Sequence, residues 1–406
     1  VAAGDYDADG DPDLLVTGIG GNRFYRNDGT AFVDVSEASG LKGNKDDYNT
    51  SAGFFDADGD GDLDVFIANY VLWSRKIDTQ LAYTLPKLGR VYGPPPIWEG
   101  RYCYLYRNEG DGTFTDVSKQ AGMHIDKEFG RPLAKALAVT FVDLERDGDM
   151  DIYVANDTER NFLFVNRGDG TFEEQGERLG VAYDGAGKTT GAMGLDIGDI
   201  FNDGGLAIGV GNYSGEVTSL FVRAPGKTAF KDRATAQGLT TPTRMLITFG
   251  YFFFDYDLDG QLDFFQTNGG IEDKGELLTP PVPFQQPSQV FRQVPEGDRV
   301  RFESLDQERA GALVTPVVGR GAAYADIDGD GDLDILVAQI DGPALLLRNN
   351  QRTGHHWLRV RLVGAGGNRE AIGAWVEVEV AGTVQRRQVM PTRSYCSQVE
   401  LPVTFG

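Results

Sequence analysis

Short apolar runs recur along the chain, and each follows a segment that is dense in aspartate. Six such runs are visible, including VFIAN at 65–69, IYVAN at 152–156 and ILVAQ at 335–339. Gly, Asp and Asn bound these runs, a pattern typical of short buried β-strands. Because a run of small or aromatic residues also precedes each acidic segment, the pattern predicts a strand, an acidic loop and a second strand.

The acidic segments form an internal repeat, and we name them loops 1 to 6. They cover residues 5–13, 56–64, 143–151, 199–207, 255–263 and 326–334. Their first residues are 51, 87, 56, 56 and 71 positions apart. Repeats of about this length indicate solenoids, propellers or arrays.

A hairpin pattern follows most of the apolar runs, as in RNDGT at 26–30 and NRGDGT at 166–171. Gly in such turns supplies the positive φ that tight hairpins require. Each unit is therefore predicted to hold about four antiparallel strands, which is typical of a propeller blade. We predict an all-β fold, a β-propeller with six visible repeats and seven blades favoured, the seventh being atypical or built from the missing ends.

Two insertions and the C-terminal part depart from the repeat. Residues 71–102 contain a segment with helical character before GPPP, and residues 271–290 are rich in Pro and Gln, which predicts a surface loop. After residue 350, apolar and polar residues alternate, which predicts half-buried strands. We therefore expect a propeller over 1–350 and a small β module over 351–406. We also expect that the first residues lie inside a repeat and that the C-terminal module is truncated.

The charge of the chain is concentrated in the loops. The net charge is −23, yet loops 1 to 6 hold 26 of the 61 acidic residues, and the rest of the chain carries 35 acidic and 37 basic residues. No basic patch stands out, which argues against nucleic acid as a partner. No run of 18 apolar residues is present, so the sequence predicts no membrane span.

The loops follow the pattern D-x-D-x-D-G-x-x-D, which we number positions 1 to 9. Oxygen ligands at alternate positions, with Gly for a sharp turn, suit Ca²⁺, whereas Mg²⁺ demands stricter octahedral geometry. The loops lack His and Cys, which disfavours zinc and copper. Five loops are complete, so we expect about five ions. The predicted ligands are Asp5, Asp7, Asp9 and Asp13; Asp56, Asp58, Asp60 and Asp64; Asp143, Glu145, Asp147 and Asp151; Asp255, Asp257, Asp259 and Asp263; and Asp326, Asp328, Asp330 and Asp334.

Loop 4 departs from this pattern. Phe201 stands at position 3 and Ala207 at position 9, so only Asp199 and Asp203 keep their carboxylates. We expect a weak metal site there, or none.

The sequence contains no catalytic signature. The three histidines are His124, His355 and His356, and the last two face opposite ways if they lie on one strand. Most carboxylates belong to the loops, and nothing singles out the remaining Glu99, Glu128 and Asp157. Whether the protein is an enzyme stays open, with a non-enzymatic function favoured.

Several smaller features have ordinary structural explanations. Arg167–Asp169 spells Arg-Gly-Asp, but it falls where the repeat places a hairpin turn. Asn49, Asn156 and Asn212 head glycan-acceptor sequons, although Asn156 and Asn212 occupy an asparagine position shared between repeats. The sequence leaves open whether Cys103 and Cys396 form a disulfide.

The loop, the apolar strand and the N-x-GDGTF hairpin together resemble the FG-GAP/VCBS repeats of integrin-like β-propellers. WLRVRLVGAGGNREAIGAWVEVEV, followed by SYCSQ, resembles the ASPIC/UnbV module, most specifically at Asn368, Ala371, Ile372, Gly373, Ala374, Ser394, Tyr395, Ser397 and Gln398. The combination resembles the cartilage acidic protein-like family. The resemblance implies a seven-bladed propeller in a secreted, cell-surface or periplasmic protein, and it implies little about activity.

Two functions are compatible with these observations. The favoured one is a binding, adhesion or self-assembling protein stabilised by calcium, whose partner is a protein, a glycan or another copy of the chain. Residues 71–102 and 271–290 would then form the contact surface. The alternative is an extracellular polysaccharide lyase, hydratase or hydrolase with its active site on a propeller face.

Overall fold

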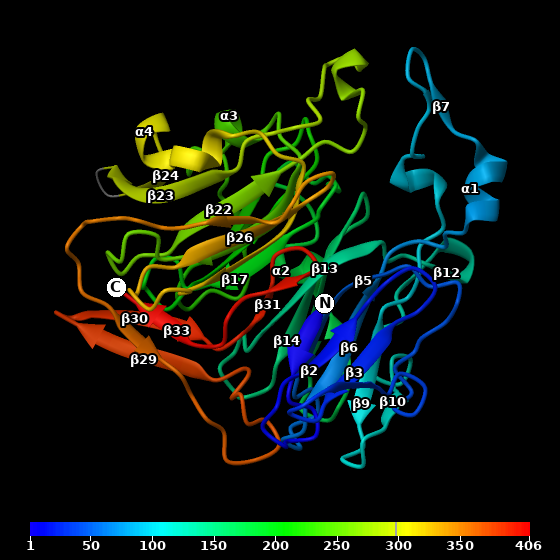
Figure 1. Cartoon of the computed structure of the whole chain (residues 1–406), viewed down its shortest axis with the longest axis horizontal. Coiled ribbons are helices and arrows are strands. Elements are labelled where there is room, and N and C mark those ends of the chain that lie inside the picture. The colour runs from blue at the N-terminus through cyan, green and yellow to red at the C-terminus, as the bar shows by residue number, and fades with distance from the viewer. Residues whose placement is uncertain (297–298) are drawn as a thin grey trace. The chain divides into compact units, whose positions relative to one another are not determined.

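The computed structural model describes residues 1–296 and 299–406. Among these residues, the strands form six antiparallel sheets of three or four strands, which are the blades of a β-propeller (Figure 1). The chain divides into two compact units, unit 1 with Val1–Gly176 and Leu362–Gly373, and unit 2 with Glu177–Arg361 and Ala374–Gly406. The predicted all-β propeller is confirmed, whereas a seventh blade stays a prediction.

Unit 1 holds blades 1 to 3. Their strands are β1 (Ala2–Gly4), β2 (Asp13–Val16), β3 (Arg23–Asn27) and β4 (Phe32–Asp34); β5 (Asn49–Phe55), β6 (Asp64–Asn69), β9 (Tyr104–Asn108) and β10 (Phe114–Asp116); and β13 (Ala136–Val142), β14 (Asp151–Asn156), β15 (Phe162–Asn166) and β16 (Phe172–Glu174). In each blade, the acidic loop connects the first two strands, as the sequence predicts.

Unit 2 holds blades 4 to 6. Their strands are β17 (Leu195–Gly198), β18 (Leu206–Val210), β19 (Ser219–Arg223) and β20 (Lys231–Asp232); β21 (Thr248–Phe254), β22 (Asp263–Asn268), β23 (Gln289–Glu296) and β24 (Arg299–Ser304); and β25 (Gly319–Ala325), β26 (Asp334–Gln339) and β27 (Leu345–Leu347). Short helices lie between the strands: α2 (Gly176–Leu179) follows β16 of blade 3, and α3 (Thr240–Thr243), α4 (Gln307–Ala310) and the 3₁₀ turns Gly275–Leu277 and Gly311–Val314 follow strands of blades 4 and 5.

The first strands of blades 2, 3 and 5 are buried along their whole length. All seven residues of β5, β13 and β21 are buried, including the polar Asn49, Thr50 and Ser51 at the start of β5. Neighbouring blades pack through aromatic rings: Phe55 and Phe141 stack with centroids 4.1 Å apart. In unit 2, Tyr251 and Phe253 of β21 join the core between blades 4 and 5, and Phe252 joins that between blades 5 and 6.

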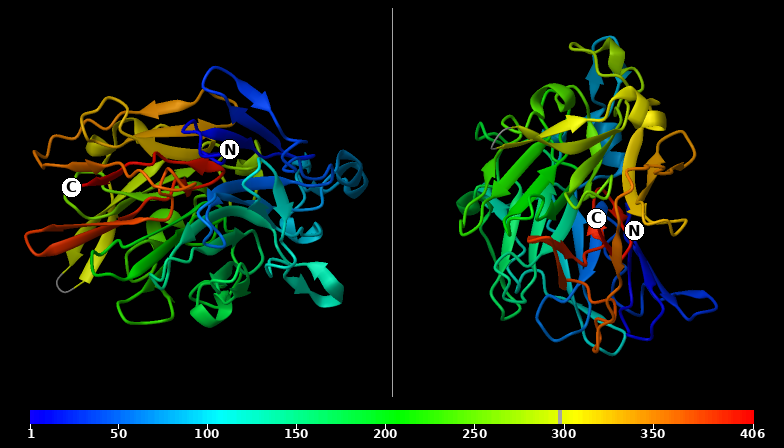
Figure 2. Two further views of the ribbon diagram at one scale, coloured as in Figure 1. Left: turned by 90° about the horizontal axis from the view of Figure 1, so that it is seen from below. Right: turned by 90° about the vertical axis from the view of Figure 1, so that its left-hand side faces the viewer.

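The insertion at 71–102 contains a helix, as predicted. Helix α1 (Arg75–Leu81) begins after Ser74, whose hydroxyl accepts a hydrogen bond from the Ile77 amide at 3.2 Å. The insertion continues with the hairpin β7 (Thr84–Leu85) and β8 (Gly89–Arg90) and the 3₁₀ turn Pro95–Ile97, and it projects from the sheets of unit 1 (Figures 1 and 2). A second hairpin of unit 1 is built from β11 (Asp126–Lys127) and β12 (Arg131–Pro132), with the 3₁₀ turn Glu128–Gly130 at its tip.

The C-terminal strands pair with one another in unit 2. β28 (Leu358–Val360) pairs with β33 (Val403–Phe405), β29 (Trp375–Val380) with β30 (Thr383–Gln388), and β31 (Thr392–Arg393) with β32 (Ser397–Gln398). Between β31 and β32, Ser394 reaches the blades, because its hydroxyl accepts a hydrogen bond from the Tyr251 amide at 3.2 Å. The division at residue 350 stays a prediction.

Candidate metal centres: the acidic loops

All six loops share one backbone conformation. The position 1 aspartate accepts a hydrogen bond from the position 6 glycine amide in every loop, as in Asp5–Gly10 at 3.0 Å and Asp255–Gly260 at 2.9 Å. The same bond joins Asp56 to Gly61, Asp143 to Gly148, Asp199 to Gly204 and Asp326 to Gly331. Positions 4 and 6 have positive φ in every loop, so glycine at position 6 avoids strain.

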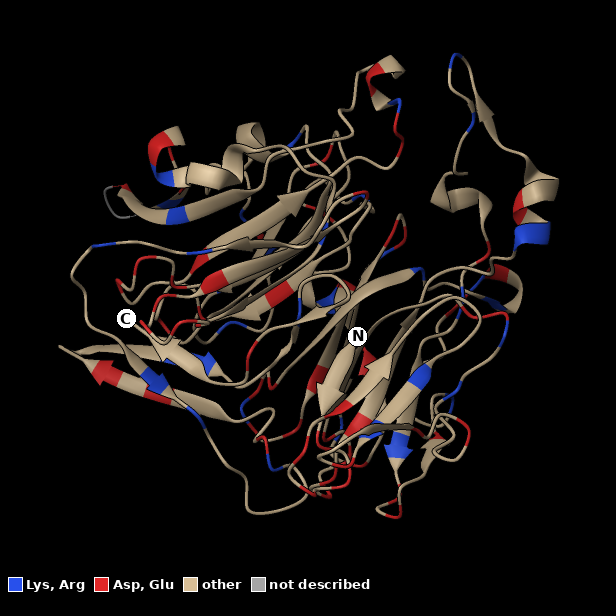
Figure 3. Cartoon of the chain, in the orientation of Figure 1, with Lys and Arg blue, Asp and Glu red and all other residues tan. Residues whose placement is uncertain are grey.

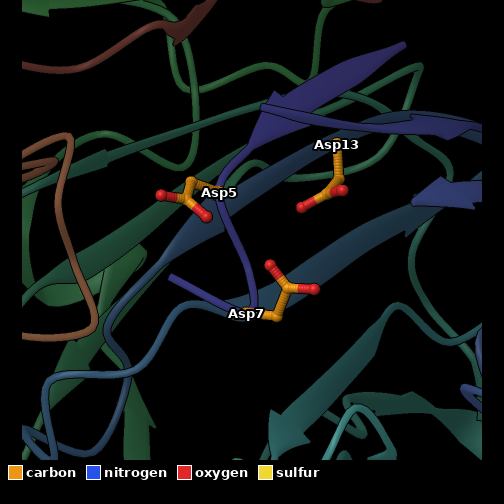
Figure 4. Close-up of side chains that lie close together, drawn as sticks. All are labelled: Asp5, Asp7 and Asp13. Atoms are coloured by element: carbon orange, nitrogen blue, oxygen red, sulfur yellow. The ribbon is translucent and has the colours of Figure 1, made fainter. Parts of the chain in front are cut away.

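In four loops, three of the predicted ligands converge on one point. The groups are Asp5, Asp7 and Asp13; Asp56, Asp58 and Asp64; Asp255, Asp257 and Asp259; and Asp326, Asp328 and Asp330. In each, one oxygen per residue lies within 4.8 Å of the others. Figure 4 shows the carboxylates of Asp5, Asp7 and Asp13 pointing toward one another.

The remaining predicted ligands lie outside these four groups. They are Asp9, Asp60, Asp263 and Asp334, together with Asp143, Glu145, Asp147 and Asp151 of loop 3. Loop 3 keeps the shared backbone, but within the described residues its carboxylates do not gather as closely. Figure 3 shows acidic residues, coloured red, gathered in loops at the ends of the strands in each unit.

Position 9 ties each complete loop to its own blade. Asp64 is buried, and its carboxylate accepts hydrogen bonds from the Ala57 amide at 2.8 Å and from the Asn108 amide in β9 at 2.7 Å. The equivalent acceptors in the other complete loops are Asp13, Asp151, Asp263 and Asp334. This aspartate therefore stabilises the loop and the adjacent strand whether or not it also binds a metal ion.

The residue that bonds position 9 also connects neighbouring blades, a role that the sequence analysis missed. The Asn108 side-chain amide donates to the Tyr6 carbonyl of loop 1 at 2.9 Å, and Asn166 donates to the Ala57 carbonyl of loop 2 at 2.9 Å. In unit 2, Gln293 reaches the Ile200 carbonyl and Asn349 reaches the Tyr256 carbonyl. The shared Asn before the hairpin glycine was the signal in the sequence.

Burial makes the loop carboxylates poor acids. Burial raises the pKa of Asp13 to about 7, and that of Asp64 and Asp151 to about 8, although backbone hydrogen bonds act in the opposite direction. Neighbouring carboxylates raise these pKa values further. A bound cation would lower these pKa values, because it favours the ionised form of every carboxylate around it.

The donor atoms also fit a cation. Asp5 Oδ1, Asp58 Oδ1 and Asp257 Oδ1 are buried, and among the described residues they have no hydrogen-bond partner. Leaving a buried acceptor unsatisfied costs about 1–3 kcal/mol. An all-oxygen shell around these atoms suits Ca²⁺.

An arginine accompanies position 3 in four of the six blades. Arg26, Arg107 and Arg292 lie on the third strand of their blades, and Arg348 directly follows the third strand of blade 6. Burial raises the pKa of Asp7, Asp58 and Asp257, and the first three arginines act in the opposite direction. Arg348 forms an ion pair with Asp328. Loops 3 and 4, with Glu145 and Phe201 at position 3, have Val165 and Val222 in place of the arginine. Arginine and position 3 aspartate thus occur together within the chain.

Comparisons with known proteins agree with this architecture. FG-GAP-like repeats match residues 5–67, 98–154 and 143–210, and the ASPIC and UnbV domain matches residues 364–406. The chain contains FG-GAP-like repeats followed by an ASPIC and UnbV domain. The resemblance seen in the loops, the hairpins and the C-terminal motif is thereby confirmed.

The FG-GAP-like chain has named relatives. It is 30% identical over 217 residues to cartilage acidic protein 1 of Homo sapiens, and the aligned region covers 52% of this chain and 29% of that protein. It is 29% identical over 221 residues to the Xenopus tropicalis protein, covering 52% of this chain and 30% of that protein. The chain thus spans less than a third of these relatives. A lectin of Agrocybe aegerita that recognises non-reducing terminal N-acetylglucosamine aligns with 17% identity and a TM-score of 0.42, covering 86% of this chain and 79% of the lectin.

The smaller sequence features lie in structural positions. Asp169 accepts hydrogen bonds from the Thr171 amide and hydroxyl, and Arg167 pairs with Glu173 at 3.1 Å, so Arg-Gly-Asp forms the predicted hairpin turn. Cys103 and Cys396 lie in the described part of the chain, and neither forms a disulfide there. Burial raises the pKa of the Cys103 thiol to about 12.

The three sequon asparagines are buried, which argues against glycans on the folded protein. The Asn49 side-chain amide donates to the Asn22 side chain. The Asn156 amide donates to the Arg160 carbonyl, and the Asn212 amide donates to the Val217 carbonyl. His124 stacks on Tyr102 with ring centroids 4.0 Å apart, and the His355 ring bonds the Asp257 carbonyl at 2.8 Å.

Asp157 is more distinctive than its sequence suggested. It follows β14, at the opposite end of the strand from loop 3, and Tyr70 donates a hydrogen bond to its carboxylate at 2.6 Å. Burial raises the pKa of Asp157 to about 6, while Tyr70 and Lys135 act in the opposite direction. Lys135 is only 1% exposed and pairs with Glu159 at 3.1 Å.

No helix among the described residues is long and apolar enough to cross a membrane.

Proposed function

We propose that this protein is a secreted or cell-surface β-propeller that is stabilised by calcium and binds a macromolecular partner. The observation that carries the proposal is the separation of two kinds of surface in unit 1. The acidic loops lie at the beginning of the second strands, whereas the insertion at 71–102 begins where β6 ends. One end of the blades would bind metal ions, and the other would contact the partner.

The calcium part of the proposal is supported by the oxygen-only ligands, by the shared loop geometry and by the unsatisfied buried oxygens of Asp5, Asp58 and Asp257. Calcium sites of extracellular modules bind at about 10⁻⁴–10⁻³ M, which sets the calcium concentrations to be tested. We expect calcium to raise the melting temperature and a chelator to lower it, because an ion that binds only the native state stabilises it. A melting temperature that ignores both treatments would reject the metal sites.

The partner-binding part is supported by exposed aromatic side chains in unit 1. Tyr92, in the insertion, is 74% exposed, and Phe129, at the tip of the β11–β12 hairpin, is 91% exposed. Phe129 also has a φ of 65°, a conformation that costs a bulky residue roughly 1–2 kcal/mol. A strained and exposed phenylalanine has no evident role in folding, and it is well placed for contact with a partner.

The experiment compares three variants of the chain on a glycan array, on a panel of immobilised extracellular matrix proteins and in light scattering for self-association. The variants are Tyr92→Ser, Phe129→Asn and, as a control on the other end of the blade, Phe32→Ser, whose side chain is 52% exposed. Tyr92→Ser and Phe129→Asn should each reduce binding at least tenfold, without loss of melting temperature. Unchanged binding by both variants would show that the contact surface lies elsewhere, and residues 271–290 would be tested next.

The alternative function, a polysaccharide-cleaving enzyme, draws on the Asp157 cluster. A carboxyl group with a pKa of about 6 beside a tyrosine hydroxyl and a buried lysine has the groups that proton transfer to and from a sugar requires. Incubation with a panel of acidic and neutral polysaccharides, followed by mass analysis, tests this function. Products that disappear in both Asp157→Asn and Tyr70→Phe would favour the enzyme, and intact polysaccharides would exclude it for that panel.

A further inference from the structure

Loop 4 keeps the shape of a metal loop although it lacks half of the ligands. The Asp199 carboxylate accepts hydrogen bonds from the Gly204 amide at 2.9 Å and from the Asp203 amide at 3.2 Å. Asn202 and Gly204 have φ values of 55° and 82°, the same positive signs found at positions 4 and 6 elsewhere. The backbone is therefore in the metal-loop conformation without the carboxylates at positions 3 and 9.

The missing ligands are replaced by apolar residues in register. Ala207 pairs with Gly198, just as Asp64 pairs with Phe55 in blade 2 and Asp263 with Phe254 in blade 5. Phe201 packs against the core cluster between blades 4 and 5. These residues leave Asp199, which is fully buried, with a negative charge that two backbone amides cannot neutralise.

A guanidinium group from the C-terminal strands lies at this carboxylate. Arg386 of β30 places Nη1 3.4 Å from Asp199 Oδ2, and its side chain is 17% exposed. Glu377, its cross-strand partner on β29, accepts a hydrogen bond from Arg386 Nε at 2.8 Å and so orients the side chain. The arginine is therefore fixed from the hairpin side as well as from the loop side.

We propose that Arg386 is a permanent counter-ion that replaces the cation in loop 4, so that this loop is neutralised by the ASPIC and UnbV domain and not by calcium. The inference rests on the proposed calcium function of the other loops. Two further bonds hold loop 4 without metal, from Asn202 to the Gly260 carbonyl at 2.8 Å and from Gln293 to the Ile200 carbonyl at 2.5 Å. Loop 6 also contacts an arginine, Arg359, but it retains all its ligands, so the arginine alone does not distinguish loop 4.

The first test restores the metal ligands in the presence and absence of the arginine. Phe201→Asp combined with Ala207→Asp rebuilds the loop pattern, and Arg386→Gln removes the positive charge while keeping most of the side-chain volume. Bound calcium is counted by elemental analysis after dialysis, and its affinity is measured by calorimetry. The triple variant should bind one ion more than the wild type. The double variant, which keeps Arg386, should bind that ion at least tenfold more weakly, because a fixed positive charge opposes the cation.

Equal affinity in the double and triple variants would overturn the proposal, as would a folded triple variant that gains no ion. Arg386→Lys in the same background is the matched control, since it keeps the charge and should also weaken the new site.

The second test uses the natural loop and does not depend on the folding of the redesigned one. Arg386→Gln should lower the melting temperature equally in calcium and in chelator, because the ion pair with Asp199 involves no metal. Asp58→Asn, in loop 2, should lose stability in calcium and little in chelator, because Asp58 Oδ1 has no hydrogen-bond partner among the described residues. An Arg386→Gln variant as stable as the wild type in chelator would overturn the proposal that Arg386 is the counter-ion of loop 4. If the wild type holds no calcium, the proposed metal function fails, whereas the chelator measurement still tests Arg386.

Discussion

At the scale of single residues, the aspartates of one loop have different tasks. Position 9 is buried, and each of its two carboxylate oxygens accepts a backbone hydrogen bond, whereas position 5 is exposed and accepts one, as Asp60 does from the Asp62 amide. An asparagine at position 5 can keep that single bond, so its loss should be felt only through the ion, whereas an asparagine at position 9 loses a bond even without metal. The sequence pattern treats both as equal, because both are aspartates at regular spacing.

Asp64→Asn should therefore destabilise the protein even in chelator. The asparagine amide would face one of the two N–H donors, from Ala57 and Asn108, and leave it unsatisfied, at a cost of about 1–3 kcal/mol. Asp60→Asn should lose stability only when calcium is present. Urea denaturation with and without chelator separates the two, and equal losses in both media for both variants would contradict this division of roles.

Asp157 predicts a pH dependence that is independent of the loops. Its folded pKa is about 6, above the value of about 3.9 for an unfolded aspartate, so the folded state binds more protons between these values. By linkage, the contribution of the protonated carboxyl to stability is complete below about pH 4 and is lost as the pH rises through 6. Ionised Asp157 should thus cost on the order of 3 kcal/mol.

The measurement compares the free energy of unfolding of the wild type and Asp157→Asn in saturating calcium. The asparagine stays neutral, so the free energy of unfolding of the variant should increase relative to that of the wild type as the pH rises from 5 to 8. Tyr70→Phe serves as the control, since it removes the hydrogen bond to the carboxylate and keeps the titrating group. A constant difference between the wild type and Asp157→Asn would contradict the raised pKa.

At the scale of elements, the blades are joined by side chains that leave one blade and bond the loop of the previous one. Asn349 of blade 6 donates to the Tyr256 carbonyl of loop 5 at 2.8 Å. The next residue, Asn350, donates only to the Arg348 carbonyl beside it. The chain thus offers two adjacent asparagines, of which one connects two blades.

Asn349→Ala should lower the free energy of unfolding by about 1–2 kcal/mol, because the Tyr256 carbonyl loses its partner. Asn350→Ala should change it by less than about 0.5 kcal/mol, the usual range for surface substitutions. Thermal and urea denaturation of the two variants measure the difference. Equal losses would show that the bond between blades contributes nothing specific.

The sequence was most informative where a pattern repeats with a fixed spacing. The acidic loops, the strands on either side and the hairpin turns all follow from Asp, Gly and apolar residues that recur in order, and the structure places them as expected. The convergence of Asp5, Asp7 and Asp13 also follows from alternate spacing. The Arg386–Asp199 pair does not, since 187 residues separate its members and no local pattern connects them.

The burial of Asp157 could not be predicted for a related reason. Its environment comes from Tyr70 of another blade and from Lys135, which precedes β13. Contacts of this kind depend on how blades pack, and packing is not written in the local sequence. The departures from the repeat, Phe201 and Ala207, were the one local sign that loop 4 would differ.

At the scale of the whole molecule, negative charge and its compensation are divided unequally between the units. Loops 1 to 3 of unit 1 hold 15 acidic residues, and loops 4 to 6 of unit 2 hold 11, as counted from the sequence. In unit 2, C-terminal arginines pair with position 1 carboxylates, Arg386 with Asp199 and Arg359 with Asp326 at 2.6 Å. In unit 1, the C-terminal segment instead brings Glu370 within 3.4 Å of the Asp5 amide.

This difference predicts that the two units respond unequally to loss of calcium. Without metal, the carboxylates of loops 1 and 2 repel one another, and two unit charges about 4 Å apart interact by about 4 kcal/mol at an effective dielectric constant of 20. Loops 1 and 2 have an arginine beside position 3, whereas Arg386 and Arg359 pair directly with the position 1 carboxylates of loops 4 and 6, so less repulsion is exposed in unit 2. Hydrogen exchange followed by mass spectrometry should show that chelator accelerates exchange in β2 and β6 more than in β18 and β26. The Arg386→Gln and Arg359→Gln substitutions together should abolish this contrast, because they remove the compensation from unit 2. Uniform acceleration across all four strands in the wild type would mean that the arginines do not substitute for the ion.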